Sequence, residues 1–283
     1  MNRFSLKVWI EGSGYPIVCL HGHPGSGRSM SVFTQHLSKR FQTIAPDLRG
    51  YGQSKTRKNF VMLDHLDDLQ GVLEQWGIDR ALVLGWSLGG IIALELAARF
   101  PEKVSGLILV ATSARPWGDH PRISLQDNVY TAVAGVLNVI KPGWQWNIDT
   151  FAKRSLFRYL IQQHTPATYQ YIASDAVYAF LNTSIAANRA LNAALSEGYY
   201  RVQNFEKIAC PVLMLAGEHD RHITAISSVE TAKHLLNCEY KVYPDTAHLL
   251  PWEVPESILA DVDQWLDRHP EAYGQSSERG VGK

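Results

Sequence analysis

A serine flanked by glycines is the first feature of this chain that could support chemistry. Gly85-Trp86-Ser87-Leu88-Gly89 fits the pattern G-x-S-x-G and lies between a strand pattern at 81–84 and a helical pattern at 88–99. On so tight a strand-to-helix turn the serine hydroxyl projects from the sheet edge, and only glycines allow strand and helix to approach closely enough. The alternative is a structural turn whose serine caps the helix. The setting favours Ser87 as a nucleophile.

A serine attacks at neutral pH only when a base accepts its proton and an acid orients that base. In this topology the acid and the histidine follow the serine along the chain, each just beyond a strand. Asp220 follows the strand pattern 212–216, and His248 follows another at 240–243. The order Ser87, Asp220, His248 therefore predicts a catalytic triad, with Asp220 preferred because it lies furthest into its loop. The rival acids are Glu218, Asp245 and, less favourably, Asp119.

The segment His21-Gly22-His23-Pro24-Gly25 follows a third apolar strand pattern, at 17–20. Acyl transfer places negative charge on a carbonyl oxygen, and preorganised backbone N–H donors lower that barrier. One donor is expected from Leu88, the residue after the nucleophile, and the second from His23. These two amides predict an oxyanion hole.

A zinc site on His21 and His23, joined by His219 and His222, is the competing interpretation, because two histidines one residue apart can share a metal. No further metal-binding pattern follows these histidines in the sequence. We therefore predict neither a metal nor a cofactor.

Strand and helix patterns alternate through most of the chain, which favours an α/β fold with a largely parallel sheet. Gly12-Ser13-Gly14 predicts the turn of an antiparallel hairpin at the sheet edge. Apolar periodicity predicts strands at 5–10, 16–20, 43–45, 81–84, 104–110, 212–216 and 239–243, and core helices at 28–38, 62–76, 88–99, 224–236 and 255–267.

The alternation is interrupted between residues 113 and 207, where no buried strand pattern occurs and aromatic residues are frequent. So long a segment without structure of its own would be unusual, so helices are expected at 123–140, 150–163, 167–181 and 184–200. The predicted organisation is a core formed by 1–113 and 208–270, a helical cap at 114–207 and a disordered tail at 271–283.

Most aromatic side chains of the insertion should pack the cap's own core, and a few should line the entrance to a pocket. We predict that Trp86, Trp117 and Trp144 contact the substrate, which favours a small, mostly apolar molecule.

Charge and composition exclude several classes of protein. Lys plus Arg and Asp plus Glu each number 27, so the chain lacks the basic field that would hold nucleic acid or an anionic membrane. No apolar run approaches the ~18 residues of a membrane span, and Lys7 stands where a signal peptide would be apolar. The three cysteines, Cys19, Cys210 and Cys238, are widely spaced, as expected of free thiols in the cytoplasm. We expect a cytoplasmic monomer or homodimer with a small-molecule substrate.

These motifs, in this order, resemble those of the α/β-hydrolase fold family, in its cap-bearing branch of small esterases, cofactor-free haloperoxidases, epoxide hydrolases and carbon–carbon bond hydrolases. The resemblance extends from Arg3 to Arg268 and includes the run Asp47-Leu48-Arg49-Gly50-Tyr51-Gly52-Gln53-Ser54, a scaffold loop in the family. It implies a mostly parallel eight-stranded sheet flanked by helices, with a helical cap insertion.

The residue at the nucleophile position separates activities within that family. Epoxide hydrolases and haloalkane dehalogenases carry aspartate where this chain has Ser87, and prolyl aminopeptidases differ at His23 and Leu88. We therefore predict a serine hydrolase that cleaves a carboxylic ester or related acyl bond of a small, mostly apolar substrate through an acyl-enzyme intermediate. Haloperoxidase-like perhydrolysis, carbon–carbon bond hydrolysis and slow-turnover sensing of a small molecule stay open, because the fold alone does not fix the function.

Overall fold

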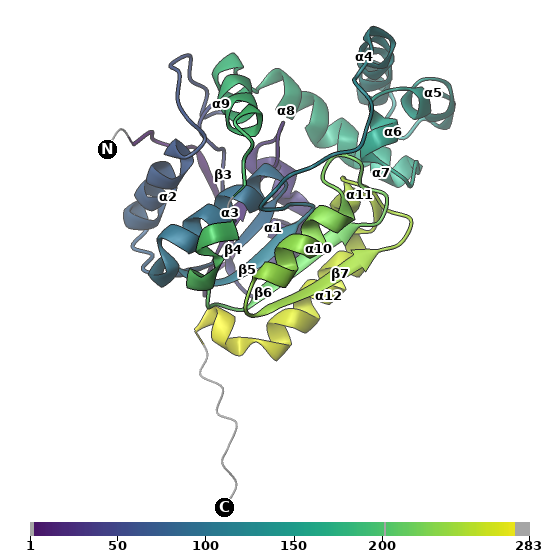
Figure 1. The fold of residues 1–283 in the computed structure, drawn as a ribbon. Helices are drawn as coiled ribbons and strands as arrows, with labels where there is room; N and C mark the ends of the chain where they lie inside the picture. Colours follow the sequence, from purple (N-terminus) through teal and green to yellow (C-terminus); the bar gives the residue numbers. More distant parts are fainter. Residues whose placement is uncertain (1–2, 201, 275–283) are drawn as a thin grey trace, which may run out of the picture.

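One seven-stranded sheet forms the centre of the computed structural model, which describes residues 3–200 and 202–274 (Figure 1). The strands lie in the order β1-β3-β2-β4-β5-β6-β7, and all neighbours are parallel except β1 and β3. Their bounds are β1 (Val8–Glu11), β2 (Pro16–Leu20), β3 (Gln42–Pro46), β4 (Ala81–Trp86), β5 (Val104–Val110), β6 (Val212–Gly217) and β7 (Cys238–Tyr243). The predicted α/β fold with a mostly parallel sheet is confirmed.

The expected count of eight strands is wrong by one. The segment 3–7, which precedes β1, forms no strand. Its amides bond to side chains instead: the Phe4 N–H donates to Asp68 Oδ1 at 2.6 Å, and the Lys7 N–H donates to Ser54 Oγ at 2.8 Å. The Lys7 carbonyl accepts the Asp47 N–H at 2.8 Å, so the segment runs beside the end of β3 without forming a strand of its own.

The predicted hairpin between the first two strands does not form. β1 pairs antiparallel with β3, with Trp9 opposite Ala45, and β3 in turn lies parallel to β2. The chain leaves β2 through the helix α1 (Ser31–Leu37) and returns beside it, a crossover that places β3 on the edge a hairpin partner would need. The turn at 12–14 therefore connects β1 to β2 across the end of β3, which lies between them in the sheet.

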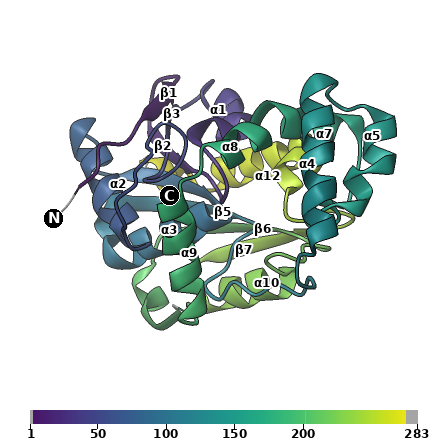
Figure 2. The same ribbon diagram turned by 90° about the horizontal axis from the view of Figure 1, so that it is seen from above.

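Helices cover both faces of the sheet, as Figure 2 shows from above. Two buried apolar clusters correspond to the two faces, because alternate residues of a strand point in opposite directions: Val18 and Leu20 belong to one cluster, Ile17 and Cys19 to the other. The first cluster packs against α2 (Asp64–Gln75), α3 (Leu88–Arg99) and α10 (Ala225–His234), and the second packs against α1 and α12 (Pro255–Arg268).

The segment between β5 and β6 is helical, as predicted, and contains no strand among its described residues. Figures 1 and 2 show α4, α5 and α7 as a lobe at one side of the core, while α8 and α9 return over it. The helices are α4 (Leu125–Ile140), α5 (Gln145–Thr150), α6 (Phe157–Leu160), α7 (Pro166–Tyr171), α8 (Val177–Leu181) and α9 (Ile185–Ser196).

The helix expected at 150–163 is broken. Ser155 Oγ donates to the Ala152 carbonyl at 2.7 Å and accepts the Phe157 N–H at 3.1 Å, so its side chain replaces bonds that a continuous helix would make. The chain forms only the short turn η3 (Ala152–Arg154) and then α6.

The predicted disordered tail begins too early. Residues 271–273 belong to the 3-10 turn η6 (Pro270–Tyr273), where Ala272 is fully buried and its carbonyl accepts the Ser105 hydroxyl at 2.6 Å. An alanine in this run is small enough to pack beneath β5, a contact that composition does not reveal. The rest of the expected tail, 275–283, lies outside the described residues.

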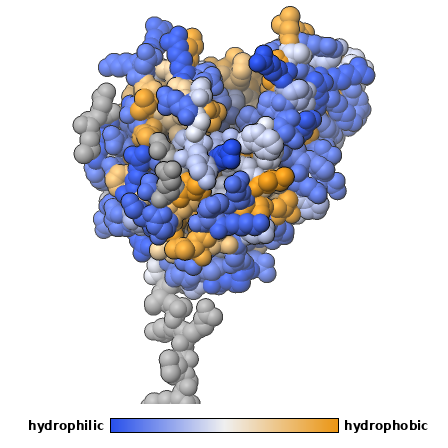
Figure 3. All heavy atoms as spheres, viewed as in Figure 1, coloured by the Kyte–Doolittle hydropathy of each residue, from blue (hydrophilic) through white to orange (hydrophobic). Residues whose placement is uncertain are grey.

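The face of the molecule drawn in Figure 3 is mostly hydrophilic, and its apolar residues form separate patches. Among the described residues, no helix has both the length and the apolar character needed to cross a bilayer.

The helical segment between β5 and β6 contains a buried carboxylate, Asp175, in the π-helical turn Ile172–Ala176. Burial raises the pKa of this carboxyl to about 6, against the smaller opposing influence of the Arg28 charge. The folded state therefore retains a proton on Asp175 at pH values where the unfolded chain, with a pKa near 3.8, has lost it. The protonated Asp175 side chain therefore contributes fully to the free energy of unfolding below about pH 3.8. This contribution is lost as the pH rises through about 6.

We expect Asp175→Asn to stabilise the protein at pH 7.5, because asparagine keeps the shape of the side chain without burying a charge. The gain should be on the order of 1–3 kcal/mol, should fall to about half at pH 5 and should be small at pH 4. Thermal unfolding followed by circular dichroism at the three pH values would measure it. The control is Asp149→Asn, which removes an exposed cap carboxylate that bonds to Lys153 and should not stabilise. A gain in stability that does not change with pH would contradict the raised pKa of Asp175.

Candidate active site

Ser87 lies on a sharp turn between the end of β4 and the start of α3. Its backbone has φ 53° and ψ −117°, a strained conformation for a residue with a side chain. A Cβ on Gly85 would lie 2.4 Å from the Gly89 carbonyl oxygen, and a Cβ on Gly89 would lie 2.1 Å from the Leu20 carbonyl oxygen. Both glycines are therefore required for the approach of strand and helix that presents the Ser87 hydroxyl.

Two loops beyond β6 and β7 bring Asp220 and His248 to this hydroxyl. Ser87 Oγ lies 3.0 Å from His248 Nε2, and His248 Nδ1 lies 2.8 Å from Asp220 Oδ2. All three side chains are almost completely buried. The other Asp220 oxygen accepts the backbone N–H groups of His222 and Ile223 at 2.8 and 2.9 Å, which holds the carboxylate in one orientation. The hydroxyl, imidazole and carboxylate form one continuous line of hydrogen bonds.

The rival acids point elsewhere. Glu218 and Asp245 are exposed, and their carboxylates lie 3.8 and 3.9 Å from the His219 ring. Asp119 accepts from Arg221 Nε at 3.2 Å on the surface. Each of the three thus has a cationic or imidazole partner other than His248.

The loop that follows β2 approaches the nucleophile closely, since a Cβ on Gly22 would lie 3.1 Å from Ser87 Cβ. His21 supports this loop from beneath: its Nε2 accepts the Leu48 N–H at 3.0 Å, so its Nδ1 carries the proton and donates to the Gly22 carbonyl at 2.8 Å. Burial lowers the pKa of His21 to about 4, which keeps this neutral tautomer in place.

The two predicted oxyanion donors belong to the two segments next to Ser87, the start of α3 and the loop after β2. Leu88 is the first residue of α3, where a backbone N–H has no partner within the helix. His23 lies on the approaching loop, and its ring Nδ1 is 2.9 Å from the Tyr51 hydroxyl. Burial, with a smaller contribution from His21, lowers the pKa of His23 to about 4. Its ring is therefore neutral near pH 7.

The three predicted substrate-binding tryptophans occupy different places. Trp86 is buried beneath the His248 loop, where its Nε1 donates to the His248 carbonyl at 3.3 Å and its ring packs against Trp252. Trp117 is exposed, and its carbonyl accepts the Thr224 N–H in the loop after Asp220. Trp144 packs on Trp146 and Lys141 near α5, in the lobe at the side of the core. Of the three, Trp86 and Trp117 are joined to the triad loops.

Sequence reasoning missed Glu253, a buried carboxylate at the end of α11 (Leu250–Glu253). Its Oε1 accepts the N–H of Ala247, which precedes the candidate base, at 2.8 Å. Its Oε2 accepts the N–H groups of Gln162 and Gln163 in the cap at 2.8 and 2.6 Å. Burial raises the pKa of Glu253 despite these three donors. This one carboxylate joins the helical segment between β5 and β6 to the His248 loop, a role that no motif signals.

The competing zinc interpretation finds no support in the geometry. Within the part of the chain that the structure describes, no group of three or more His, Cys, Asp or Glu side chains is arranged to hold a metal ion. His21 uses both ring nitrogens for backbone bonds, so it has none to offer a metal.

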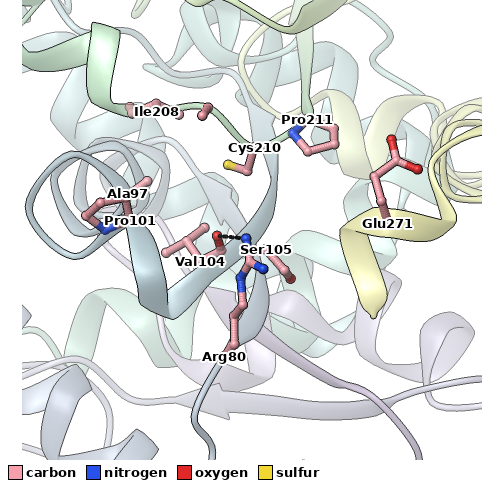
Figure 4. Close-up of a pocket in the computed structure, with 10 residues that line it drawn as sticks. Arg80, Ala97, Pro101, Val104, Ser105, Ile208, Cys210, Pro211 and Glu271 are labelled. Carbon is pink, nitrogen blue, oxygen red and sulfur yellow. Dashed lines mark hydrogen bonds between the residues drawn. The ribbon is translucent and has the colours of Figure 1, made fainter. Parts of the chain in front are cut away.

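A hollow of about 270 Å³ lies at the opposite end of the sheet (Figure 4). Its lining includes Arg80, Val104 and Pro211, which stand at the amino ends of β4, β5 and β6, whereas the triad follows the carboxyl ends. Arg80 donates to the Val104 carbonyl at 3.3 Å, and burial raises the pKa of the Cys210 thiol to about 11. This hollow thus has no reactive thiolate and no connection to the nucleophile.

Comparisons with known proteins identify the family and the fold. The family model described as the alpha/beta hydrolase fold matches residues 15–255. A pimeloyl-[acyl-carrier protein] methyl ester esterase of Nitrosomonas europaea is 28% identical, covering 92% of this chain and 98% of that protein.

Solved structures of similar fold include enzymes with different activities. An esterase from Thermogutta terrifontis superimposes with a TM-score of 0.72 at 24% identity, covering 95% of this chain and 94% of that one. A meta-cleavage product hydrolase from Pseudomonas fluorescens gives 0.69 at 16% identity, covering 93% and 94%. The family match over most of the chain, together with the sheet order and the sharp turn at Ser87, identifies the protein as a hydrolase of the alpha/beta hydrolase fold family.

Proposed function

We propose that this protein is a serine hydrolase that cleaves a carboxylic ester of a small, mostly apolar molecule through an acyl-enzyme intermediate. The observation that carries the proposal is the hydrogen-bonded line from Ser87 through His248 to Asp220, with distances of 3.0 and 2.8 Å. The Nitrosomonas relative, whose name is that of a methyl ester esterase, supports an ester as the bond that is cleaved.

In the first half of the proposed reaction, Ser87 Oγ attacks the carbonyl carbon while His248 Nε2 accepts the hydroxyl proton. The carbonyl oxygen becomes an oxyanion, which the N–H groups of His23 and Leu88 stabilise. Asp220 stabilises the imidazolium that forms. When the tetrahedral intermediate collapses, His248 gives its proton to the departing alcohol, and the acyl group remains on Ser87.

In the second half, water takes the place of the alcohol. His248 accepts a proton from the water, whose oxygen attacks the acyl carbon, and the same two amides stabilise the second oxyanion. Collapse breaks the bond to Ser87 Oγ, which recovers its proton from His248. The carboxylic acid leaves, and the site returns to its starting state.

The experiment that tests this proposal is labelling with a fluorophosphonate, followed by a panel of esters. The reagent resembles the tetrahedral intermediate, so it reacts only where an activated serine and working oxyanion donors coincide. We expect intact-mass spectrometry to show one adduct and peptide mapping to place it on Ser87. Activity should survive EDTA, because no step uses a metal.

The ester panel should rank substrates by polarity. Aryl and alkyl esters of short apolar acids should be hydrolysed faster than the monomethyl ester of a dicarboxylic acid, because the proposed substrate is mostly apolar and a free carboxylate is costly to remove from water. The reverse ranking would contradict the apolar substrate class. Labelling without turnover of any ester would exclude the esterase and favour a slow sensor or carbon–carbon bond hydrolysis. A folded protein that is not labelled would refute the serine mechanism.

A further inference from the structure

Four aromatic or imidazole rings form a continuous column that ends on the candidate base. Tyr159, in the cap helix α6, stacks on His120 with ring centroids 5.6 Å apart. His120 stacks almost parallel on His222, at 5.7 Å and 5° between planes. His222 in turn meets His248 at 4.7 Å with the planes inclined by 66°. A column of this kind connects the cap to the reacting imidazole by direct contact.

Backbone bonds fix the middle of the column. The Asp119 N–H donates to the Arg221 carbonyl, and the Thr224 N–H donates to the Trp117 carbonyl, both at 3.0 Å. The start of the cap and the loop after Asp220 are thus paired along their length, which brings His120 and His222 face to face. The His222 N–H also donates to Asp220 Oδ1 at 2.8 Å, so the residue is anchored to the acid of the triad.

The ring of His222 is neutral. The residue is exposed at the surface, but the His120 and His248 rings lie against its imidazole, and the loss of water there lowers the pKa of His222, with smaller contributions from the charges of His248, His120 and His23. Its contact with His248 is therefore a packing contact at neutral pH. A second positive charge beside the base would oppose formation of the imidazolium, and a neutral ring does not.

The contact between the His222 and His248 rings matters most in the second half of the proposed reaction, the hydrolysis of the acyl-enzyme. Before reaction His248 is held at both nitrogens, by Ser87 Oγ and by Asp220. Once Ser87 is acylated it has no hydroxyl proton to donate, so the Nε2 bond is lost. The imidazole must then receive water while held by the Asp220 bond and by whatever packs against its ring.

We propose that His222 is a positioning residue for deacylation: its ring keeps the His248 imidazole in line while Ser87 carries the acyl group, and His120 supports it from the cap side. The proposal rests on the serine mechanism proposed above. Loss of the His222 ring should leave acylation, in which Ser87 itself helps to hold His248, less affected than hydrolysis of the acyl-enzyme. A displacement of about 1 Å at a reacting group can cost on the order of 10²-fold in rate.

The test compares His222→Ala, His222→Gln and His222→Phe with His219→Ala, measured with a p-nitrophenyl ester. Alanine and glutamine lack a ring, whereas phenylalanine keeps a neutral ring of similar size. His219 is the matched control, because it is a histidine of the same loop whose ring faces Glu218 and Asp245. Glutamine, closer to histidine in size, keeps the test readable if the alanine variant does not fold.

We expect kcat to fall by about 10- to 100-fold in the alanine and glutamine variants. The value of kcat/KM, which reports acylation, should fall much less, so KM should decrease. Quenched samples should show accumulated acyl-enzyme by intact mass. The phenylalanine variant should retain kcat within about 3-fold, and His219→Ala should behave as wild type. A double-mutant cycle with His120→Ala should show non-additive losses, as residues in one packed column do.

Equal losses in kcat and kcat/KM without accumulated acyl-enzyme would reject the role in deacylation, and so would an alanine variant indistinguishable from His219→Ala. Failure of phenylalanine to preserve kcat would reject packing as the cause. The wild type is labelled with fluorophosphonate in the same series, so an unlabelled wild type would refute the serine mechanism itself. A labelled, active wild type with unaffected His222 variants would refute only the proposal for His222.

Discussion

Replacing Ser87 with alanine should lower kcat/KM for an ester by about 10⁴-fold or more, with little change in the thermal midpoint. The substitution removes only Oγ, which in the proposed mechanism forms the acyl bond and whose hydrogen bond to His248 measures 3.0 Å. A site without its nucleophile retains only binding and oxyanion stabilisation, which is why so large a loss is expected. Initial rates with a p-nitrophenyl ester would measure it.

The matched control for this substitution is Ser113→Ala. Ser113 is also buried, and its hydroxyl bonds to Ser227 Oγ at 2.6 Å, away from the triad. Removing that hydroxyl should cost some stability, on the order of 1 kcal/mol, and leave activity close to that of the wild type. If Ser87→Ala kept a tenth of the activity, Ser87 would not be the nucleophile.

Asp220→Asn should lower kcat by roughly 10⁴-fold, the scale known for the same change in a serine protease triad. One oxygen of Asp220 accepts two backbone N–H groups, so an asparagine should place its carbonyl oxygen there. Its NH₂ group would then donate to His248 Nδ1 and force the proton onto Nε2. In that tautomer the imidazole cannot accept the Ser87 proton, so the base is lost although the shape is kept.

The rival acids supply the controls for the acid of the triad. Asp245→Asn and Glu218→Gln remove exposed carboxylates near His219 and should change kcat by less than about 3-fold. Steady-state kinetics of the three variants, with circular dichroism to verify folding, would separate the roles. A crippled Asp245→Asn variant beside an active Asp220→Asn variant would move the acid to Asp245.

Local patterns located much of the fold, because they record requirements that a few neighbouring residues satisfy. The glycines around Ser87 are needed for the contacts of α3 with β4 and β2, and the apolar strands are buried on both faces, so both leave a trace in the sequence. The position of β3 between β1 and β2 left no such trace in the sequence. Which strand lies beside β1 depends on a crossover, and the glycine turn at 12–14 suits either path.

The candidate site also has parts that the sequence predicts and parts that it does not. Ser87, Asp220 and His248 each follow a recognisable strand, so their convergence could be predicted before any distance was known. The ring column could not, because His120 and His222 come from loops about a hundred residues apart and histidine has no periodic pattern there. The sequence could not place Trp117 and Trp144 for another reason: an aromatic side chain packs equally well in a lobe or at a pocket, and composition does not distinguish the two.

The Glu253 carboxylate limits how the helical segment between β5 and β6 can be exchanged by protein engineering. Specificity in a capped hydrolase invites chimeras in which one cap is exchanged for another at the ends of β5 and β6. Here such a graft would remove the Gln162 and Gln163 amides and leave the buried Glu253 carboxyl group with one of its three backbone donors, immediately beside the loop of the base. An incoming cap must therefore present two consecutive N–H groups at that place, or the recipient must exchange Glu253 for a neutral residue at the same time. The helical segment between β5 and β6 is therefore tied to the loop of the base and cannot be exchanged on its own.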